Sequence, residues 1–267
     1  MDNAAERAVE RVIAVMRDNL DEQLTIDDMA KVAMFSKFHF SRIFQRVTGL
    51  SPGRFLSALR LQRAKQLLVS TSYNIADISL RVGYTSVGTF STRFTRSVGL
   101  SPTTYRRQQG VTPYIETTCP NHAVGVATGS MRGVIRSATP ERDELIFAGL
   151  FRDRIPEGRP VSCTVLAGAG PFLLEKVPPG MWYLLVHSVP AGTETARPGT
   201  PGTDQLAAAT LGPVAVRQEA SIEGVEVQLR SMGSMDPPVL MALLDVRTAA
   251  LERIGQQRMR RPDRSIR

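Results

Sequence analysis

The feature that most constrains this chain is an internal repeat with an offset of 50 residues. Seven residues of the first copy recur unchanged in the second, and an eighth changes only from phenylalanine to tyrosine. The first copy contains Phe40, Phe44, Arg46, Gly49, Leu50, Ser51, Pro52 and Phe55, and the second contains Phe90, Phe94, Arg96, Gly99, Leu100, Ser101, Pro102 and Tyr105. Because so many matches in one register rarely arise by chance, the sequence predicts two copies of one structural unit.

Each copy contains a stretch with the pattern of an amphipathic helix. In residues 36–47 the apolar side chains recur at the spacing that places them on one helical face. These residues are Phe40, Ile43, Phe44 and Val47, and the opposite face carries Lys37, Phe38, Ser41, Arg42 and Gln45. Cationic, amide and hydroxyl groups can read base edges in the major groove of DNA. Taken alone, this pattern is equally typical of a solvated surface helix, and the repeat is what favours DNA recognition.

The residues before this stretch predict a partner helix and a short turn. Thr25 and Asp28 have the spacing of a capping box, in which the threonine oxygen accepts backbone N–H groups at a helix start. A helix over residues 26–32 then meets Ser36, a residue type favoured at helix N-caps. A further amphipathic helix is expected over residues 4–19, where it braces the unit. Helix, short turn, helix is the arrangement that presents a second helix to a DNA groove.

A long helix over residues 52–69 is expected to connect the two copies. Gly49 is placed to end the preceding helix in a left-handed conformation, and Ser51 and Pro52 suit the N-cap and the first helical position. Eighteen residues of helix span roughly 27 Å. One turn of duplex is about 34 Å. A rigid connector of this length therefore suits two reading helices in successive major grooves on one side of the DNA.

The second reading helix, expected over residues 86–98, has a poorer set of groups for reading bases. Its buried stripe is predicted to contain Phe90, Phe94 and Val98. The groove-facing residues are Val87, Gly88, Ser91, Thr92 and Thr95, with Arg93 and Arg96 towards the edges. We therefore expect the first helix to supply more hydrogen-bond readout and the second more methyl and shape contact.

The duplicated motifs resemble a known family. Gly49-Leu50-Ser51-Pro52 and Gly99-Leu100-Ser101-Pro102, each five residues after a phenylalanine, are similar to signatures of the AraC/XylS transcription regulators, as are Arg60-Leu61-x-x-Ala64 and the closing Tyr105-Arg106. The resemblance covers residues 5–108 and implies an all-helical domain with two helix-turn-helix units that bind an asymmetric DNA site. It places base contacts at Phe38, Ser41 and Arg42 in the first unit and at Val87, Gly88, Ser91 and Thr92 in the second. The second unit departs from the pattern at Thr92, where the family usually has an arginine.

The charge of the chain is divided unevenly along its length. Residues 1–110 hold 16 Lys and Arg against nine Asp and Glu, whereas residues 111–246 hold 10 against 14. A basic first domain favours a polyanionic partner, and the acidic middle segment argues against DNA contact there. We also expect base contacts from Lys37 and Gln45. Phosphate contacts are expected from Arg46, Arg93, Arg96, Arg106 and Arg107.

After residue 109 the pattern predicts a β-rich region. We expect a linker over residues 110–121, a domain over residues 122–257 and a basic, disordered tail over residues 258–267. Short strands are predicted at 124–126, 145–150, 161–166, 172–174, 181–187, 214–216 and 225–229, which suggests a β-sandwich. A mobile loop over 190–203, a helical segment over 204–210 and a closing helix over 238–255 are also expected. A Gly-Pro and Pro-Pro-Gly hairpin at residues 170–183 resembles those of transthyretin-like and carboxypeptidase-regulatory-like sandwiches.

The second domain offers few groups for chemistry. Phe172, Trp182 and Tyr183 are candidates for an effector pocket, although aromatic side chains at strand spacing are more often core. The two cysteines, Cys119 and Cys163, and the three histidines do not have metal-ligand spacing. The order Cys119, His122 faintly resembles the reactive-cysteine motif of alkyltransferases, but an ordinary thiol is favoured. We expect no catalytic residue, metal or cofactor.

These observations predict an all-α double helix-turn-helix domain followed by a β-sandwich-like domain with a C-terminal helix. The predicted function is sequence-specific regulation of transcription by a cytoplasmic protein whose second domain dimerises or senses an effector. Double-stranded DNA is the expected partner, with RNA polymerase, a small-molecule effector and a second copy of the chain as further candidates and no membrane. The alternatives are a DNA-tethered enzyme, a sensor with a helix-containing effector domain, and a non-specific architectural protein.

Overall fold

Helices occupy the first part of the chain and strands the second in the computed structural model, which describes residues 3–110, 128–137, 144–190 and 206–241. The helices are α1 (Asn3–Asp18), α2 (Ile26–Ala33), α3 (Lys37–Thr48), α4 (Pro52–Ser70), α5 (Ile75–Arg81), α6 (Val87–Val98) and α7 (Pro102–Arg107). They belong to a helical unit, whereas the strands belong to a separate β unit. The predicted change from helix to strand is therefore observed.

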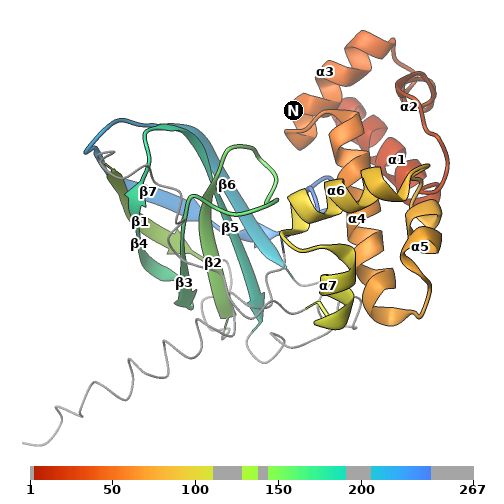
Figure 1. The fold of residues 1–267 in the computed structure, drawn as a ribbon. Helices are drawn as coiled ribbons and strands as arrows, with labels where there is room; N and C mark the ends of the chain where they lie inside the picture. Colours follow the sequence, from red (N-terminus) through yellow and green to blue (C-terminus); the bar gives the residue numbers. More distant parts are fainter. Residues whose placement is uncertain (1–2, 111–127, 138–143, 191–205, 242–267) are drawn as a thin grey trace, which may run out of the picture. The chain divides into compact units, whose positions relative to one another are not determined.

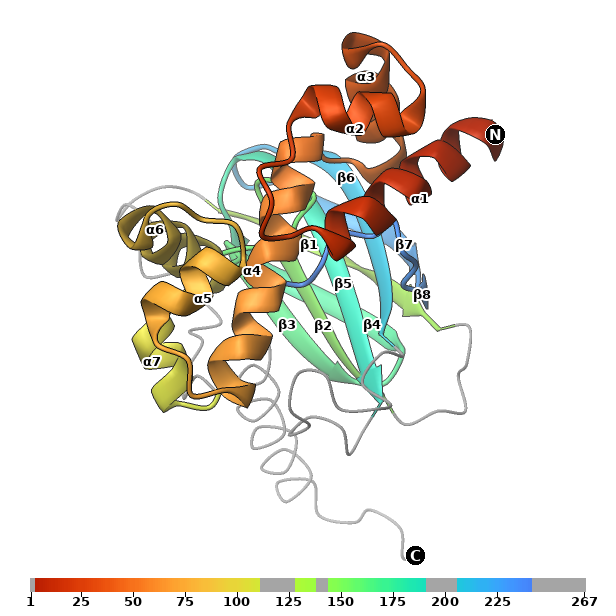
Figure 2. The same ribbon diagram turned by 90° about the vertical axis from the view of Figure 1, so that its right-hand side faces the viewer.

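The helical unit is built as two similar bundles that share α4. In both views α2 and α3 lie beside one end of α4, with α5, α6 and α7 beside the rest of it (Figure 1, Figure 2). Helices α1 to α4 form the first bundle, and α4 to α7 repeat that order in the second. The connector helix is thus the last helix of one bundle and the first of the next, as the repeat predicts.

The repeated aromatic residues form the cores of the two bundles. Phe40, Phe44 and Phe55 are fully buried, and the successive ring centroids are 5.5 Å apart in edge-to-face contacts. In the second bundle Phe94 packs edge-to-face against Tyr105, also at 5.5 Å. Aromatic pairs of this geometry add to the stabilisation from apolar burial. Repeating the phenylalanines therefore repeats the core.

Backbone caps end and begin the helices largely as the sequence predicts. Thr25 and Asp28 form the expected capping box, and the hydrogen bonds from Thr25 lower the pKa of the Asp28 carboxyl. Gly49 adopts the expected left-handed conformation with φ of 77°. The prediction for Ser36 is only partly right, because Ser36 occupies the N-cap position of α3 but its side chain makes no capping hydrogen bond.

Two arginines brace the bundles by binding backbone carbonyl groups. Arg60 on α4 donates from Nε to Leu20 O (2.9 Å) and from Nη2 to Glu22 O. Arg106 on α7 does the same for the second bundle, donating to Leu68 O (3.1 Å) and to Tyr73 O. The first two carbonyl groups follow α1, and the second two lie at or just after the C-terminal end of α4. Carbonyl groups at the end of a helix have no intrahelical donor.

The helical unit also contains two short segments from later in the chain, Arg154–Gly158 and Met232–Met241. In the first segment Glu157 accepts a hydrogen bond from Arg54 Nη2 on α4 at 3.0 Å. Backbone carbonyl groups of the second segment accept hydrogen bonds from Lys65 Nζ. Two cations of α4 are therefore engaged within this unit.

The described residues of the β unit form two sheets. Its strands are β1 (Gly129–Arg136), β2 (Glu144–Phe151), β3 (Ser162–Ala167), β4 (Gly170–Val177), β5 (Gly180–Pro190), β6 (Ala207–Val216), β7 (Ser221–Gln228) and β8 (Arg230–Ser231). One sheet has the order β4-β1-β7 and the other β3-β2-β5-β6-β8. All pairs are antiparallel except β1 with β7. Side chains from both sheets form one apolar core that includes Met131, Ile146 and Leu184.

Several predictions for this region need correction. The prediction of a helical segment at residues 204–210 is wrong for residues 207–210, because these begin β6 and pair with β5. Alanine favours helices, but the antiparallel pairing of β6 with β5 along the strand outweighs that weak preference. Strand β1 was not predicted, since Gly129 and Gly133 interrupt its apolar pattern. Residues 238–241 are not helical, and the rest of the predicted closing helix lies outside the described residues.

Other predictions for this region cannot be compared with the structure. Four predicted segments fall wholly or mostly outside the described residues: the linker, the strand at 124–126, the loop at 190–203 and the tail. The strands expected at the positions of β2, β3, β4, β5, β6 and β7 are confirmed, and most of the observed strands are longer than predicted. The predicted ranges at β3 and β7 each run one residue beyond the observed strand.

Candidate nucleic-acid interface

Helix α3 presents the predicted reading residues on its exposed face. Phe38 is 81% exposed although it is a large apolar residue in the first turn, and Arg42 and Gln45 are also exposed. On the other face Phe40, Ile43 and Phe44 are buried, and Thr48 joins them, whereas the predicted Val47 is only half-buried. The helix therefore has the two distinct faces that the sequence predicts.

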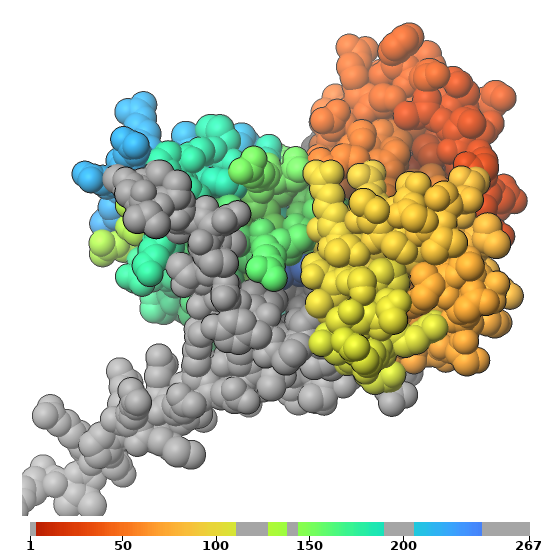
Figure 3. Space-filling view, viewed as in Figure 1, coloured from red at the N-terminus to blue at the C-terminus, as the bar shows by residue number. Residues whose placement is uncertain are grey.

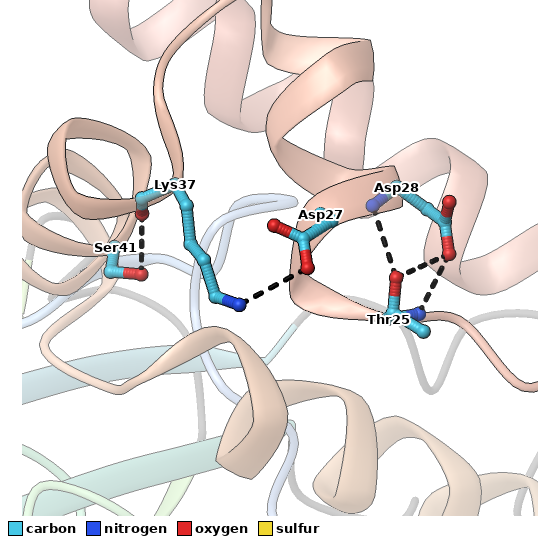
Figure 4. A network of polar contacts seen from close by, with 5 residues as sticks. All are labelled: Thr25, Asp27, Asp28, Lys37 and Ser41. Atoms are coloured by element: carbon cyan, nitrogen blue, oxygen red, sulfur yellow. Dashed lines mark hydrogen bonds and ion pairs between the residues drawn. The ribbon is translucent and has the colours of Figure 1, made fainter.

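The N-terminal turn of α3 is tied to α2 by polar contacts. Lys37 Nζ lies 3.1 Å from Asp27 Oδ2, and both side chains are at least half exposed (Figure 4). Ser41 Oγ donates to Lys37 O at 2.9 Å within the helix. Sequence reasoning named Lys37 and Ser41 but missed Asp27. The sequence showed only that the two copies differ here, because the second copy has Ala76 where the first has Asp27.

Helix α6 presents a smaller and less polar set. Val87, Gly88 and Thr92 are exposed, and Ser91 is half-buried. No described ion pair fixes this face, in contrast to that of α3. Ser86 Oγ caps α6 by accepting a hydrogen bond from the backbone N–H of Thr89, at 3.4 Å. The second reading helix is thus equally well formed but carries fewer groups that can donate to a base.

The predicted phosphate-binding arginines fall into two groups. Arg46, Arg93, Arg96 and Arg107 are exposed at the surface of the helical unit. Arg106 is half-buried, and its Nε and Nη2 already donate to backbone carbonyl groups. A phosphate contact by Arg106 would therefore have to use Nη1 or the second N–H of Nη2. In the space-filling view the yellow surface of α6 and α7 borders the orange surface of the first bundle (Figure 3).

The effector pocket predicted in the β unit is not assembled by its three aromatic residues. Phe172 and Trp182 are buried in the shared core of the two sheets, and Trp182 Nε1 donates to Pro178 O at 2.8 Å. Tyr183 follows Trp182 along β5 and so points to the opposite face of the sheet. The three residues therefore do not share one pocket, because the alternation of side chains along a strand separates them.

The described residues contain no group of three or more His, Cys, Asp and Glu side chains that could hold a metal ion. Cys163 and His187 are buried in the β unit, while Cys119 and His122 lie outside the described residues. None of the helices that the structure describes is long and apolar enough to cross a membrane.

Comparison with known proteins agrees with this geometry. Residues 29–108 match the family model described as a helix-turn-helix domain. An HTH-type transcriptional regulator of Bacillus subtilis, YbfP, is 36% identical over 101 residues, which are 38% of this chain and 34% of that protein. The TetD protein of transposon Tn10 from Escherichia coli is 33% identical over 101 residues, covering 38% of this chain and 73% of TetD.

A solved structure is also similar to part of this chain. It is a transcriptional regulator of Chromobacterium violaceum with an AraC-type DNA-binding domain, 31% identical, covering 39% of this chain and 93% of that one with a TM-score of 0.38. The chain spans about a third of the length of YbfP and most of TetD. The likeness lies in the helical part, where the repeat, the caps and the exposed reading faces also lie. The chain therefore belongs to the AraC/XylS family of transcription regulators.

Proposed function

We propose that this protein is a sequence-specific, DNA-binding transcription regulator that reads two successive major grooves with α3 and α6. The observation that carries the proposal is the pair of helix-turn-helix units on one connector, each with a buried aromatic face and an exposed face. Helix α4 has 19 residues. It therefore spans roughly 28 Å, which is close to the spacing of successive grooves.

Affinity and specificity are expected to come from different residues. The exposed arginines, Arg46, Arg93, Arg96 and Arg107, would neutralise phosphate groups and make binding depend on salt. Phe38, Ser41, Arg42 and Gln45 on α3 would supply most of the direct base readout, with Lys37 beside them. Val87, Gly88, Ser91 and Thr92 on α6 would supply methyl contacts and a close fit to the groove.

For the β unit we infer a β-sandwich that joins two copies of the protein. Its two sheets share one core, and the outward face of the three-stranded sheet exposes Val134 (36%) and Leu173 (47%) on neighbouring strands. The burial of Phe172 and Trp182 leaves less support for a ligand pocket between the sheets. Apolar side chains that are exposed together on one sheet face favour association when they form a contiguous patch. Sedimentation of Val134→Glu should show a shift toward monomer, and an unchanged dimer would contradict this role.

The test of the main proposal is selection of DNA from a random duplex library, followed by footprinting of the enriched site. We expect one motif and a discrete protected region that spans two adjacent major grooves. Raising the salt concentration should weaken binding to random DNA and to the selected site, while the protected region keeps its boundaries. Uniform protection without an enriched motif would instead show a non-specific architectural protein.

A further inference from the structure

A hollow of about 630 Å³ opens between the connector helix α4 and the second reading helix α6. Both helices belong to the helical unit. We call it the α4–α6 hollow, and its lining includes Leu56, Ser57, Tyr84 and Thr92. Pockets that bind small molecules usually enclose about 300–1,000 Å³. The hollow is therefore of a size that fits a small organic ligand.

The floor of the hollow is apolar. Leu56 is only 5% exposed, and the half-buried ring of Tyr84 lies in the same lining, with its hydroxyl 3.3 Å from Ser57 Oγ. Two glycines, Gly53 on α4 and Gly88 on α6, also line the hollow and take up little of its space because they carry no side chain. An apolar ring or short chain would therefore lose its contact with water on this floor, which favours its binding.

The remaining charge in the hollow is entirely positive. Three arginines line it, Arg60, Arg93 and Arg96, and no Asp or Glu lies among the lining residues. Arg60 donates its hydrogen bonds to backbone carbonyl groups, and the carboxylate of Asp21, which is not among the lining residues, also acts on its charge. Burial lowers the pKa of this guanidinium, which nevertheless remains a cation. Arginine binds carboxylate, sulfonate and phosphate groups through paired N–H donors.

We propose that the α4–α6 hollow binds a small organic anion with an apolar body, and that this anion competes with DNA. The apolar body would lie against Leu56 and Tyr84, and the anionic group would meet Arg93 and Arg96 at the mouth. The competition rests on the proposed function, because Gly88 and Thr92 line the hollow and are also predicted base contacts. A ligand bound only by the DNA-free protein shifts the population away from DNA. The helical unit would then sense an anion without a signal from the β unit.

The binding arm of the experiment uses the full chain and the fluorescent anion 8-anilino-1-naphthalenesulfonate as the probe. A Gly53→Phe variant should fill the hollow, because a Cβ at Gly53 meets no atom within 4 Å and its backbone is helical. We expect an affinity loss of at least about tenfold, since the probe loses its apolar contacts. Gln62→Phe, at an exposed position of α4 outside the lining, is the matched control and should bind the probe like wild type.

A second pair of measurements tests the charge. N-phenyl-1-naphthylamine has a similar apolar body without the sulfonate, and it should bind wild type roughly tenfold more weakly. Arg96→Gln should weaken binding of the sulfonate probe but not of the uncharged one. This variant also keeps the test decisive if Gly53→Phe fails to fold. Equal binding of the sulfonate probe by wild type, Gly53→Phe and Arg96→Gln would overturn the proposal.

The competition arm uses the selected duplex with a fluorescent label and follows its anisotropy. Saturating sulfonate probe should weaken DNA binding by wild type and by Gln62→Phe. If Gly53→Phe loses DNA binding but binds the probe normally, the hollow contacts the DNA backbone and does not bind the anion, so the proposal is wrong. If wild type shows no specific DNA binding at all, the proposed function fails, while the two binding arms still decide whether the hollow takes an anion.

Discussion

The two helix-turn-helix units share their buried face and differ on their exposed face. Phe40 and Phe44 of α3 correspond to Phe90 and Phe94 of α6, and all four are fully buried. On the exposed side, Arg42 of α3 corresponds to Thr92 of α6. The buried positions agree because packing restricts them in both copies, since a core tolerates little change in volume. The exposed positions are not held by packing and can differ according to the DNA that each helix meets.

The largest effect is expected where the two copies agree. Phe44→Ala and Phe94→Ala should each lower the free energy of unfolding by about 3–5 kcal/mol, because both rings are fully buried and would leave cavities. Urea denaturation followed by circular dichroism measures the loss. Phe38→Ala, which removes an exposed ring from the same helix, is the control and should change stability little. A loss confined to one of the two core variants would show that the cores are not equivalent.

The next largest effect is expected where the copies differ. Arg42→Ala should weaken binding to the selected site by about 1–3 kcal/mol relative to random DNA, because a bidentate arginine contact discriminates between bases. Thr92→Ala should cost less than about 1 kcal/mol, since a hydroxyl and a methyl group discriminate weakly. Anisotropy titrations with selected and random duplexes give both values. Equal losses of specificity would remove the distinction between the two helices.

The turns between the helices offer a smaller comparison. Met34 adopts a left-handed conformation with φ of 58°, where the second copy has Gly83 with φ of 78°. Met34→Gly should raise the free energy of unfolding by about 0.5–1 kcal/mol, because glycine adopts this conformation without the steric cost of a side chain. Met34→Ala keeps the Cβ and should not show the gain. Thermal unfolding measures both variants, and a loss of stability in Met34→Gly would mean that the exposed methionine makes contacts that matter more than backbone strain.

The smallest effect is expected at the Lys37–Asp27 ion pair of the first unit, which has no counterpart among the ion pairs described for the second. Asp27→Asn releases Lys37 and should raise affinity for random DNA by roughly two- to fivefold at low salt, since exposed ion pairs are worth about 0.2–1 kcal/mol. The gain should shrink at high salt. Asp77→Asn, which removes an exposed acidic residue from the matching helix of the second unit, is the control. If it raises affinity as much, the gain comes from net charge and not from Lys37.

The sequence predicted the helical part of the site more completely than the β part. The repeat placed both reading helices within one residue of their observed bounds, because a short helix-turn-helix is specified by local signals such as Thr25, Gly49 and Gly99. In the β unit, the outcome at residues 207–210 depended on pairing with a strand about 20 residues earlier in the chain. Local propensity does not contain that information.

The amino-acid sequence by itself determined the duplication and most of the buried stripe of each helix, since both follow from spacing along the chain. Its motifs also carried the resemblance to the AraC/XylS family. Only the tertiary structure showed that Arg106 braces α4, that Asp27 holds Lys37 and that Trp182 belongs to the core. It also brought Leu56, Tyr84 and Arg96 together around one hollow. Most of these relations join residues that are distant in sequence, and all of them depend on how helices and strands pack, which no local pattern encodes.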